Sequence, residues 1–170
     1  GNGASFDLGS GTVGSSIAAI TPRIESAGNG WYRCSISFEG GDSGISTYAV
    51  IILADGDSDD AVIANGTDGI YVYGFQVEYG ETATPYESRK NLVLLPPTSW
   101  GVSGTSIAAA PSVPDDQGGA DSYLFAELSS GGNRTIRCSA SYSAVHATVY
   151  NGDVYTSSIY IKPTGTTQIL

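Results

Sequence analysis

The side chains best suited to chemistry in this sequence are aromatic, amide and carboxylate groups, from which sugar-binding sites are built. Pyranose rings stack on aromatic faces, and amides and carboxylates hydrogen-bond the sugar hydroxyls. Candidates for such a carbohydrate-binding site are Trp31, Trp100, Tyr160, Gln76 and Glu78. Trp100 stands beside a glycine in an expected loop, where it is either an exposed platform or a lid on the core.

The candidates on two strands also have a structural interpretation. Alternation places Trp31 and Arg33 on the face of their strand opposite the expected core, and Gln76 and Glu78 on the corresponding face of theirs. A structural pair between Arg33 and Glu78 under a packed Trp31 is therefore the alternative to ligand contact. We favour this alternative.

No catalytic set is recognisable in the sequence. A single histidine, His146, leaves little for a Ser/His or Cys/His nucleophile, and no run of paired carboxylates of the glycosidase kind occurs. Zinc is not supported either, because no cluster of cysteine and histidine is present. We expect a protein that is not an enzyme and that carries no cofactor.

An acidic loop at 54–61 resembles the start of a calcium-binding loop, because Asp55, Asp57 and Asp59 alternate along it. The loop lacks the glycine and the glutamate that complete an EF-hand, so that motif is excluded. Either a looser calcium site or a solvated hairpin loop fits the pattern. A second, weaker acidic candidate consists of Asp115, Asp116 and Asp121.

Composition favours strands and excludes two classes of partner. The 170 residues include 23 Gly and 11 Tyr, and only 14% are charged, which favours short strands and tight turns over helices. The net charge of −10 would repel nucleic-acid phosphates and anionic lipid headgroups. No apolar run approaches the ~20 residues that span a bilayer. We expect neither nucleic acid nor membrane as a partner.

Alternating polarity predicts the strands that position the candidate residues. In 32–38 the side chains of Tyr32, Cys34, Ile36 and Phe38 share one face, which we expect to be core, while the opposite face is expected to be wet. Further strands are expected at 48–53, 70–79, 123–128, 135–142, 146–150 and 157–162. Many short strands without an amphipathic helix predict an all-β, antiparallel two-sheet β-sandwich.

Turn signals separate these strands. Asn-Gly occurs at 29–30, 65–66 and 151–152, and both residues tolerate the positive φ that a type I′ hairpin turn requires. The sequence around 151–152, ATVY-NG-DVYT, predicts a hairpin.

The two cysteines, Cys34 and Cys138, occupy similar strand contexts, YRCSISF and IRCSASY. Two free thiols in the core and one disulfide bond across the sandwich both fit this pattern. Two cysteines are too few to indicate a disulfide framework.

Several motifs resemble a known family. The segments 6–14 (FDLGSGTVG), 27–38 (AGNGWYRCSISF) and 68–88 (DGIYVYGFQVEYGETATPYES) resemble the second half of concanavalin-A-like or carbohydrate-binding jelly-roll domains. The segments 91–104 and 153–170 look like the first half of such a domain. These domains occur in phage tail-fibre and virion-surface proteins and in bacterial exoproteins. The resemblance implies a jelly-roll sandwich at an extracellular or virion-surface location.

The order of these motifs is displaced relative to the family, in which the strand resembling IYIKPTG precedes the segment resembling FDLGSG. We therefore expect 1–87 to be the C-terminal half of a jelly-roll unit, 88–92 a linker and 93–170 the N-terminal half. The chain is then either one circularly permuted domain or a window on a tandem array. In an array, neighbouring copies of the repeat would share strands with it.

The resemblance implies a non-catalytic structural and adhesive repeat of a phage or bacterial surface fibre, with cell-surface or extracellular glycans as candidate ligands. The alternative is an accessory carbohydrate-binding module of a polysaccharide-degrading enzyme.

Overall fold

The computed structural model describes residues 3–40, 46–47, 50–54, 56–57, 69–87, 101–103, 105–110, 113–115, 117–127, 135–137, 147–148, 151–165 and 168–169. Within these ranges every regular element is a β-strand, and every strand pair is antiparallel. The predicted all-β, antiparallel class is confirmed.

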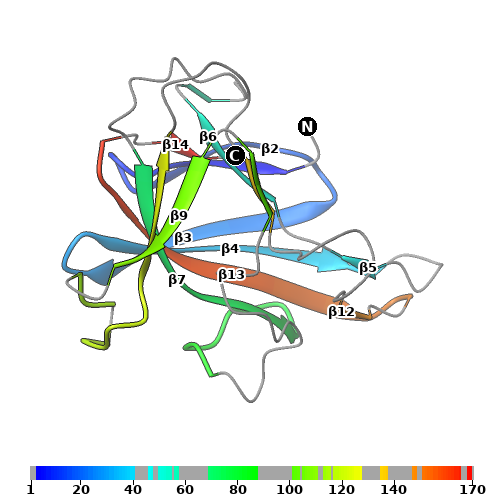
Figure 1. Cartoon of the computed structure of the whole chain (residues 1–170). Coiled ribbons are helices and arrows are strands. Elements are labelled where there is room, and N and C mark those ends of the chain that lie inside the picture. The colour runs from blue at the N-terminus through cyan, green and yellow to red at the C-terminus, as the bar shows by residue number, and fades with distance from the viewer. Residues whose placement is uncertain are drawn as a thin grey trace.

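Most strands belong to two six-stranded sheets (Figure 1). The first sheet has the order β2 (Thr12–Ser16), β1 (Ala4–Asp7), β14 (Gln168–Ile169), β6 (Val50–Ala54), β11 (Thr135–Arg137) and β8 (Gly101–Ser103). The second sheet has the order β3 (Ile20–Gly28), β4 (Trp31–Glu39), β13 (Val154–Pro163), β7 (Gly69–Tyr79), β10 (Tyr123–Glu127) and β9 (Thr105–Ala109). A separate two-stranded ribbon pairs β5 (Ser46–Thr47) with β12 (Ala147–Thr148).

The main core lies between the two six-stranded sheets. Phe6 and Ile169 of the first sheet are buried in one cluster with Ile70, Val72 and Phe125 of the second sheet. Because one apolar cluster takes side chains from both sheets, the sheets pack face to face, as in a β-sandwich.

The inner face of β4 follows the predicted alternation. Cys34 is buried in the main core, and Tyr32 and Ile36 pack against it. Phe38, at the far end of the strand, stacks on Tyr155 of β13 with ring centroids 6.0 Å apart.

Strand pairing is nested along the chain. β1 pairs with β14, β4 with β13, β6 with β11 and β7 with β10. The outermost pair places Phe6 opposite Ile169. In the middle of each sheet a strand from 93–170 therefore lies between two strands from 1–87: β14 lies between β1 and β6, and β13 lies between β4 and β7. The two blocks form the same sheets in this chain, and a permuted or tandem-array origin of their order stays a prediction.

The predicted hairpin turns have different outcomes. Asn29 and Gly30 have φ of 52° and 81°, so the type I′ turn between β3 and β4 is confirmed. Around 151–152 the predicted hairpin is wrong, because β12 pairs with β5 whereas β13 pairs with β4 and β7. Gly152 has a φ of 80°, but Asn151 is not among the described residues with positive φ, so the type I′ requirement is not met there. The 65–66 pair lies outside the described residues.

Candidate functional site

The candidate residues gather on the outer face of the second sheet, the face turned away from the main core. We expected this face to be wet, but it carries a second buried cluster, the aromatic cluster of Trp31, Tyr73 and Tyr160. Trp31 is only 1% exposed, and its indole N–H donates a hydrogen bond to the Pro114 carbonyl at 3.0 Å. The indole is thus covered and its polar atom satisfied, as the structural alternative requires.

A glycine makes the close packing of these rings possible. The pairing of β13 with β7 shifts register between Ser158 and Tyr160, and Gly74 lies at this bulge with a φ of 60°. A Cβ atom at Gly74 would lie 3.1 Å from Tyr86 Cγ and 3.2 Å from Tyr160 Cδ2. Tyr73 completes the group, with its ring centroid 5.3 Å from that of Tyr86 and 5.8 Å from that of Tyr160.

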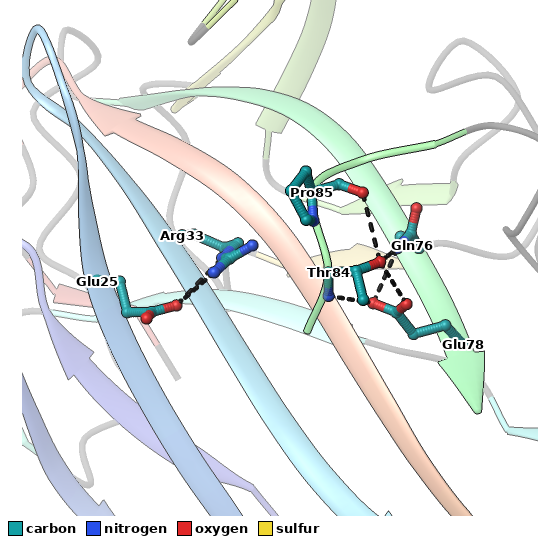
Figure 2. A network of polar contacts seen from close by, with 6 residues as sticks. All are labelled: Glu25, Arg33, Gln76, Glu78, Thr84 and Pro85. Atoms are coloured by element: carbon teal, nitrogen blue, oxygen red, sulfur yellow. Dashed lines mark hydrogen bonds and ion pairs between the residues drawn. The ribbon is translucent and has the colours of Figure 1, made fainter. Parts of the chain in front are cut away.

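The segment Gly80–Glu87, which we call the strap, follows β7 and is fastened to this outer face. Figure 2 shows Thr84 and Pro85 of the strap facing Gln76 and Glu78 of β7. The Thr84 backbone N–H donates to Glu78 Oε1 at 2.8 Å, and the Thr84 hydroxyl donates to Glu78 Oε2 at 2.7 Å. Gln76 Nε2 donates to Glu78 Oε1 at 2.8 Å, and Gln76 Oε1 accepts from the Glu87 N–H at 2.8 Å. Gln76 is fully buried and Glu78 is 5% exposed, so the hydrogen bond between these two side chains is shielded from water.

Two hydroxyl groups hold the beginning of the strap. The Ser37 hydroxyl lies 2.8 Å from the Glu81 carbonyl, and the Thr156 hydroxyl lies 2.6 Å from the Gly80 carbonyl. The two hydroxyl oxygens are also 2.8 Å apart. Side chains of three adjacent strands, β4, β13 and β7, therefore fix the path of the strap.

Arg33 pairs with a different carboxylate from the expected one. Its Nη2 lies 2.6 Å from Glu25 Oε2, whereas both oxygens of Glu78 accept bonds from Gln76 or Thr84 (Figure 2). The predicted Arg33–Glu78 pair is therefore wrong. The reason is register, because Glu25 on β3 stands directly opposite Arg33, while Glu78 lies two strands away across β13.

The surroundings of Arg33 keep its guanidinium charged. Burial alone would lower the pKa of Arg33, but the hydrogen bonds and charge of Glu25, together with Tyr160, raise it above its ordinary value. The guanidinium carbon lies 6.0 Å from the Tyr160 ring centroid, within range of a cation–π contact.

The structure thus brings four of the five predicted binding residues onto one face. Trp31 and Tyr160 lie in the aromatic cluster, and Gln76 and Glu78 in the strap network. Trp100 lies outside the described residues. The four described side chains are engaged with the protein itself, and ligand contact at any of the five stays a prediction.

Three hydroxyl side chains have a role that the sequence did not predict, namely Ser37, Thr84 and Thr156. A signal was present for Thr84, which lies in the segment 68–88 (DGIYVYGFQVEYGETATPYES) on which part of the resemblance rests. The hydrogen bonds from Thr84 to Glu78 join two residues of that segment. For Ser37 and Thr156 the only signal was a hydroxyl on the outer face of a strand.

Two of the acidic candidates, Asp57 and Asp115, accept hydrogen bonds from backbone N–H groups. Asp57 accepts hydrogen bonds from the N–H and the hydroxyl of Ser15, both at 2.8 Å. Asp115, which is 4% exposed, accepts from the N–H groups of Gln117 and Gly119. No group of three His, Cys, Asp or Glu side chains that could hold a metal ion occurs within the described ranges. Asp55, Asp59 and Asp116 lie outside those ranges, so calcium binding stays a prediction.

Cys34 is a free thiol buried in the main core. Burial raises the pKa of the Cys34 thiol well above its ordinary value, because the thiolate would lose its hydration. Cys138 and His146 lie outside the described residues.

In the part of the chain that is described, no helix is long and apolar enough to cross a membrane. Comparison of the chain with protein-family models, with curated proteins and with solved structures found no match.

Proposed function

We propose that this chain is a non-catalytic structural and adhesive module of jelly-roll type, built into an extracellular or virion-surface fibre. The nested strand pairing supports the jelly-roll assignment. A jelly roll is a double-sheet antiparallel fold, in which a long hairpin is rolled so that successive strand pairs alternate between two sheets. Here β1·β14 and β6·β11 lie in the first sheet, and β4·β13 and β7·β10 in the second.

The observation that carries the structural role is the hydrogen bonding of Gln76 and Glu78 to the strap. In a sugar-binding site an amide and a carboxylate face solvent and hydrogen-bond ligand hydroxyls. In this chain both groups are buried, and their hydrogen-bonding atoms contact Thr84, Glu87 or one another. The segment 68–88, which contains Gln76, Glu78, Thr84 and Glu87, is therefore held together by its own side chains, which favours a structural module over the alternative, an accessory carbohydrate-binding module.

The adhesive role requires aromatic side chains outside the strap network. The sequence offers Trp100, and the structure adds Tyr79, which is 56% exposed at the end of β7. The Tyr79 ring lies against Tyr155 with centroids 4.8 Å apart, so the exposed ring has a supported orientation. A supported, exposed ring is the kind of surface on which a sugar stacks.

A glycan array tests the adhesive role. The wild-type chain is compared with Trp100→Ala and Tyr79→Ala, and thermal unfolding is measured for each variant. If Trp100→Ala or Tyr79→Ala loses glycan binding while its unfolding temperature is unchanged, the result supports adhesion through the aromatic ring that was removed. Trp31→Ala serves as a control for loss of binding through loss of packing. The absence of binding to any glycan would remove the adhesive half of the proposal.

The flanking sequence of the full-length gene tests the structural half. A second copy of GWYRC or IYIKPTG beside this segment supports a fibre repeat. An adjoining polysaccharide-degrading domain supports the alternative instead.

A further inference from the structure

One contiguous segment, 154–169, fills the middle of both sheets. Its first strand, β13, lies between β4 and β7 in the second sheet, and its second strand, β14, lies between β1 and β6 in the first. All four flanking strands belong to 1–87. Taken without 154–169, the strands of 1–87 would therefore leave a gap one strand wide in each sheet.

The fit of β13 into its gap is extensive on both edges. Eight of its residues are in register with β4, and eight with β7. The seven residues Tyr155–Ile161 are all buried. A strand that is paired on both edges and buried along most of its length satisfies its backbone groups through its two neighbours.

Side chains of the segment also complete both faces of the second sheet. Ile159 and Ile161 enter the main core, Tyr160 enters the aromatic cluster, and Thr156 helps to fasten the strap. From β14, Ile169 enters the same core. The gap is thus specific for a strand with this alternation of apolar and polar side chains.

From this geometry we propose that 154–169 is a donor segment that copies of the chain exchange. The segment of one copy fills the gaps between the 1–87 strands of a second copy, with the same registers. Exchange of an identical element preserves every pairing of the fold, so it forms an assembly at little cost in contacts. Addition of a strand to an open sheet position is an established mode of association. The inference rests on the proposed role as a fibre module and supplies its means of joining copies.

Cysteine cross-linking in the full-length chain tests the exchange. Ser35 of β4 and Ser158 of β13 stand opposite one another on the outer face. Directly opposed strand residues have Cβ atoms about 4.5–5.5 Å apart, so a small local adjustment brings them to the about 3.5–4.5 Å that a disulfide bond requires. One chain carries Ser35→Cys and a second chain carries Ser158→Cys. The two chains are mixed, unfolded and refolded together in a glutathione redox buffer, and peptide mapping distinguishes the engineered bond from any bond to Cys34 or Cys138.

A mixture of Ser35→Cys and Ser106→Cys chains is the matched control, because Ser106 of β9 is exposed and opposes Ala126 of β10 rather than Ser35. A third sample carries Ser35→Cys and Ser158→Cys in one chain.

We expect an interchain disulfide bond in the mixture of Ser35→Cys and Ser158→Cys chains, and none between the introduced thiols of the control mixture. While the monomer predominates, the ratio of cross-linked dimer to monomer should rise about tenfold for a tenfold rise in concentration during refolding, by mass action.

Two results would overturn the exchange. In the first, the chain with both Ser35→Cys and Ser158→Cys forms a disulfide bond within itself, but the mixture of the two single-cysteine chains forms no interchain bond at any concentration. In the second, the two introduced thiols of the double-cysteine chain form no bond with one another, either within a chain or between chains. That result would mean that β13 does not lie beside β4. Neither result depends on glycan binding, so a failure of the adhesive proposal is distinguishable from a failure of the exchange.

Discussion

Thr84 bonds both oxygens of the Glu78 carboxylate, its N–H reaching Oε1 at 2.8 Å and its hydroxyl reaching Oε2 at 2.7 Å. One strap residue thus satisfies both oxygens of a carboxylate that is 5% exposed. A buried charged group in this position depends on its hydrogen bonds, since each one that is lost leaves part of the charge without solvation.

The replacement Thr84→Val should therefore destabilise the chain. It keeps the shape of the side chain but removes the hydroxyl donor to Glu78, which should cost about 1–3 kcal/mol in the free energy of unfolding. Urea denaturation measures this loss, and limited proteolysis should show faster cleavage within the strap. Thr84→Ser, which keeps the hydroxyl, should stay close to wild type. Equal stability of the valine and serine variants would show that the hydroxyl does not fasten the strap.

Gly74→Ala should destabilise more than Gly152→Ala. Both glycines have positive φ, so both replacements carry about 1–2 kcal/mol of backbone strain. Only at Gly74 does the added Cβ meet the Tyr86 and Tyr160 rings, which should add about 1–3 kcal/mol through overpacking. Parallel urea denaturation of the two variants measures the difference. Equal losses would mean that Tyr86 does not pack at the bulge as described.

Cys34 should resist thiol reagents while the chain is folded. Burial raises the pKa of its thiol, so the reactive thiolate does not form near neutral pH, and the reagent has no path to the sulfur. Labelling with iodoacetamide at pH 8, with sites mapped by mass spectrometry, should be at least about 10³-fold slower than in urea, because reaction requires unfolding. Rapid labelling of the folded chain, or isolation of a Cys34–Cys138 disulfide from it, would contradict the buried free thiol.

Asp7 should make a contribution to stability that disappears in acid. The hydrogen bond from the Ser10 hydroxyl, followed by that from the Ser10 N–H, lowers the pKa of Asp7 below its ordinary value of 3.8. Because the pKa in the folded chain is below that in the unfolded chain, the contribution is complete above about pH 3.8 and is lost as the pH falls through the folded value.

Urea denaturation of wild type and Asp7→Asn across pH 2–7 checks this sign. The difference in unfolding free energy should be constant at neutral pH and should shrink in acid. Ser10→Ala should reduce the pH dependence, because it removes the principal cause of the lowered pKa. A difference that grows as the pH falls would contradict the assignment.

The local alternation of side chains was enough to predict the inner face of β4. Alternation in β4 identified Cys34 and Ile36 as core residues, and the paired positive φ tolerated by Asn29 and Gly30 identified a hairpin turn. These features depend on neighbouring residues, so they can be predicted from the sequence. The prediction that the outer face of β4 is wet was wrong, because the strap, which comes later in the chain, covers part of it. The alternation of side chains along one strand does not show which other segment will cover that strand.

The partners on the outer face depend on strand order, which the sequence does not state. Arg33 pairs with Glu25 because β3 and not β7 lies beside β4 on that side. The expected hairpin around Asn151 failed for a similar reason, since β13 pairs with β4 and β7 rather than with the strand before it. The burial of Trp31 could be expected from the sequence as the structural alternative, but its hydrogen bond to Pro114 joins segments too far apart for local pattern to connect.

The nested order of strands also governs how the chain acquires its fold during synthesis. The ribosome releases 1–87 first, with the strands that flank both gaps but without β13 and β14. Neither sheet can close until 154–169 has emerged, and pairs such as Phe6 with Ile169 close very long loops. Such high contact order slows folding, and open strand edges are exposed to wrong partners in the meantime.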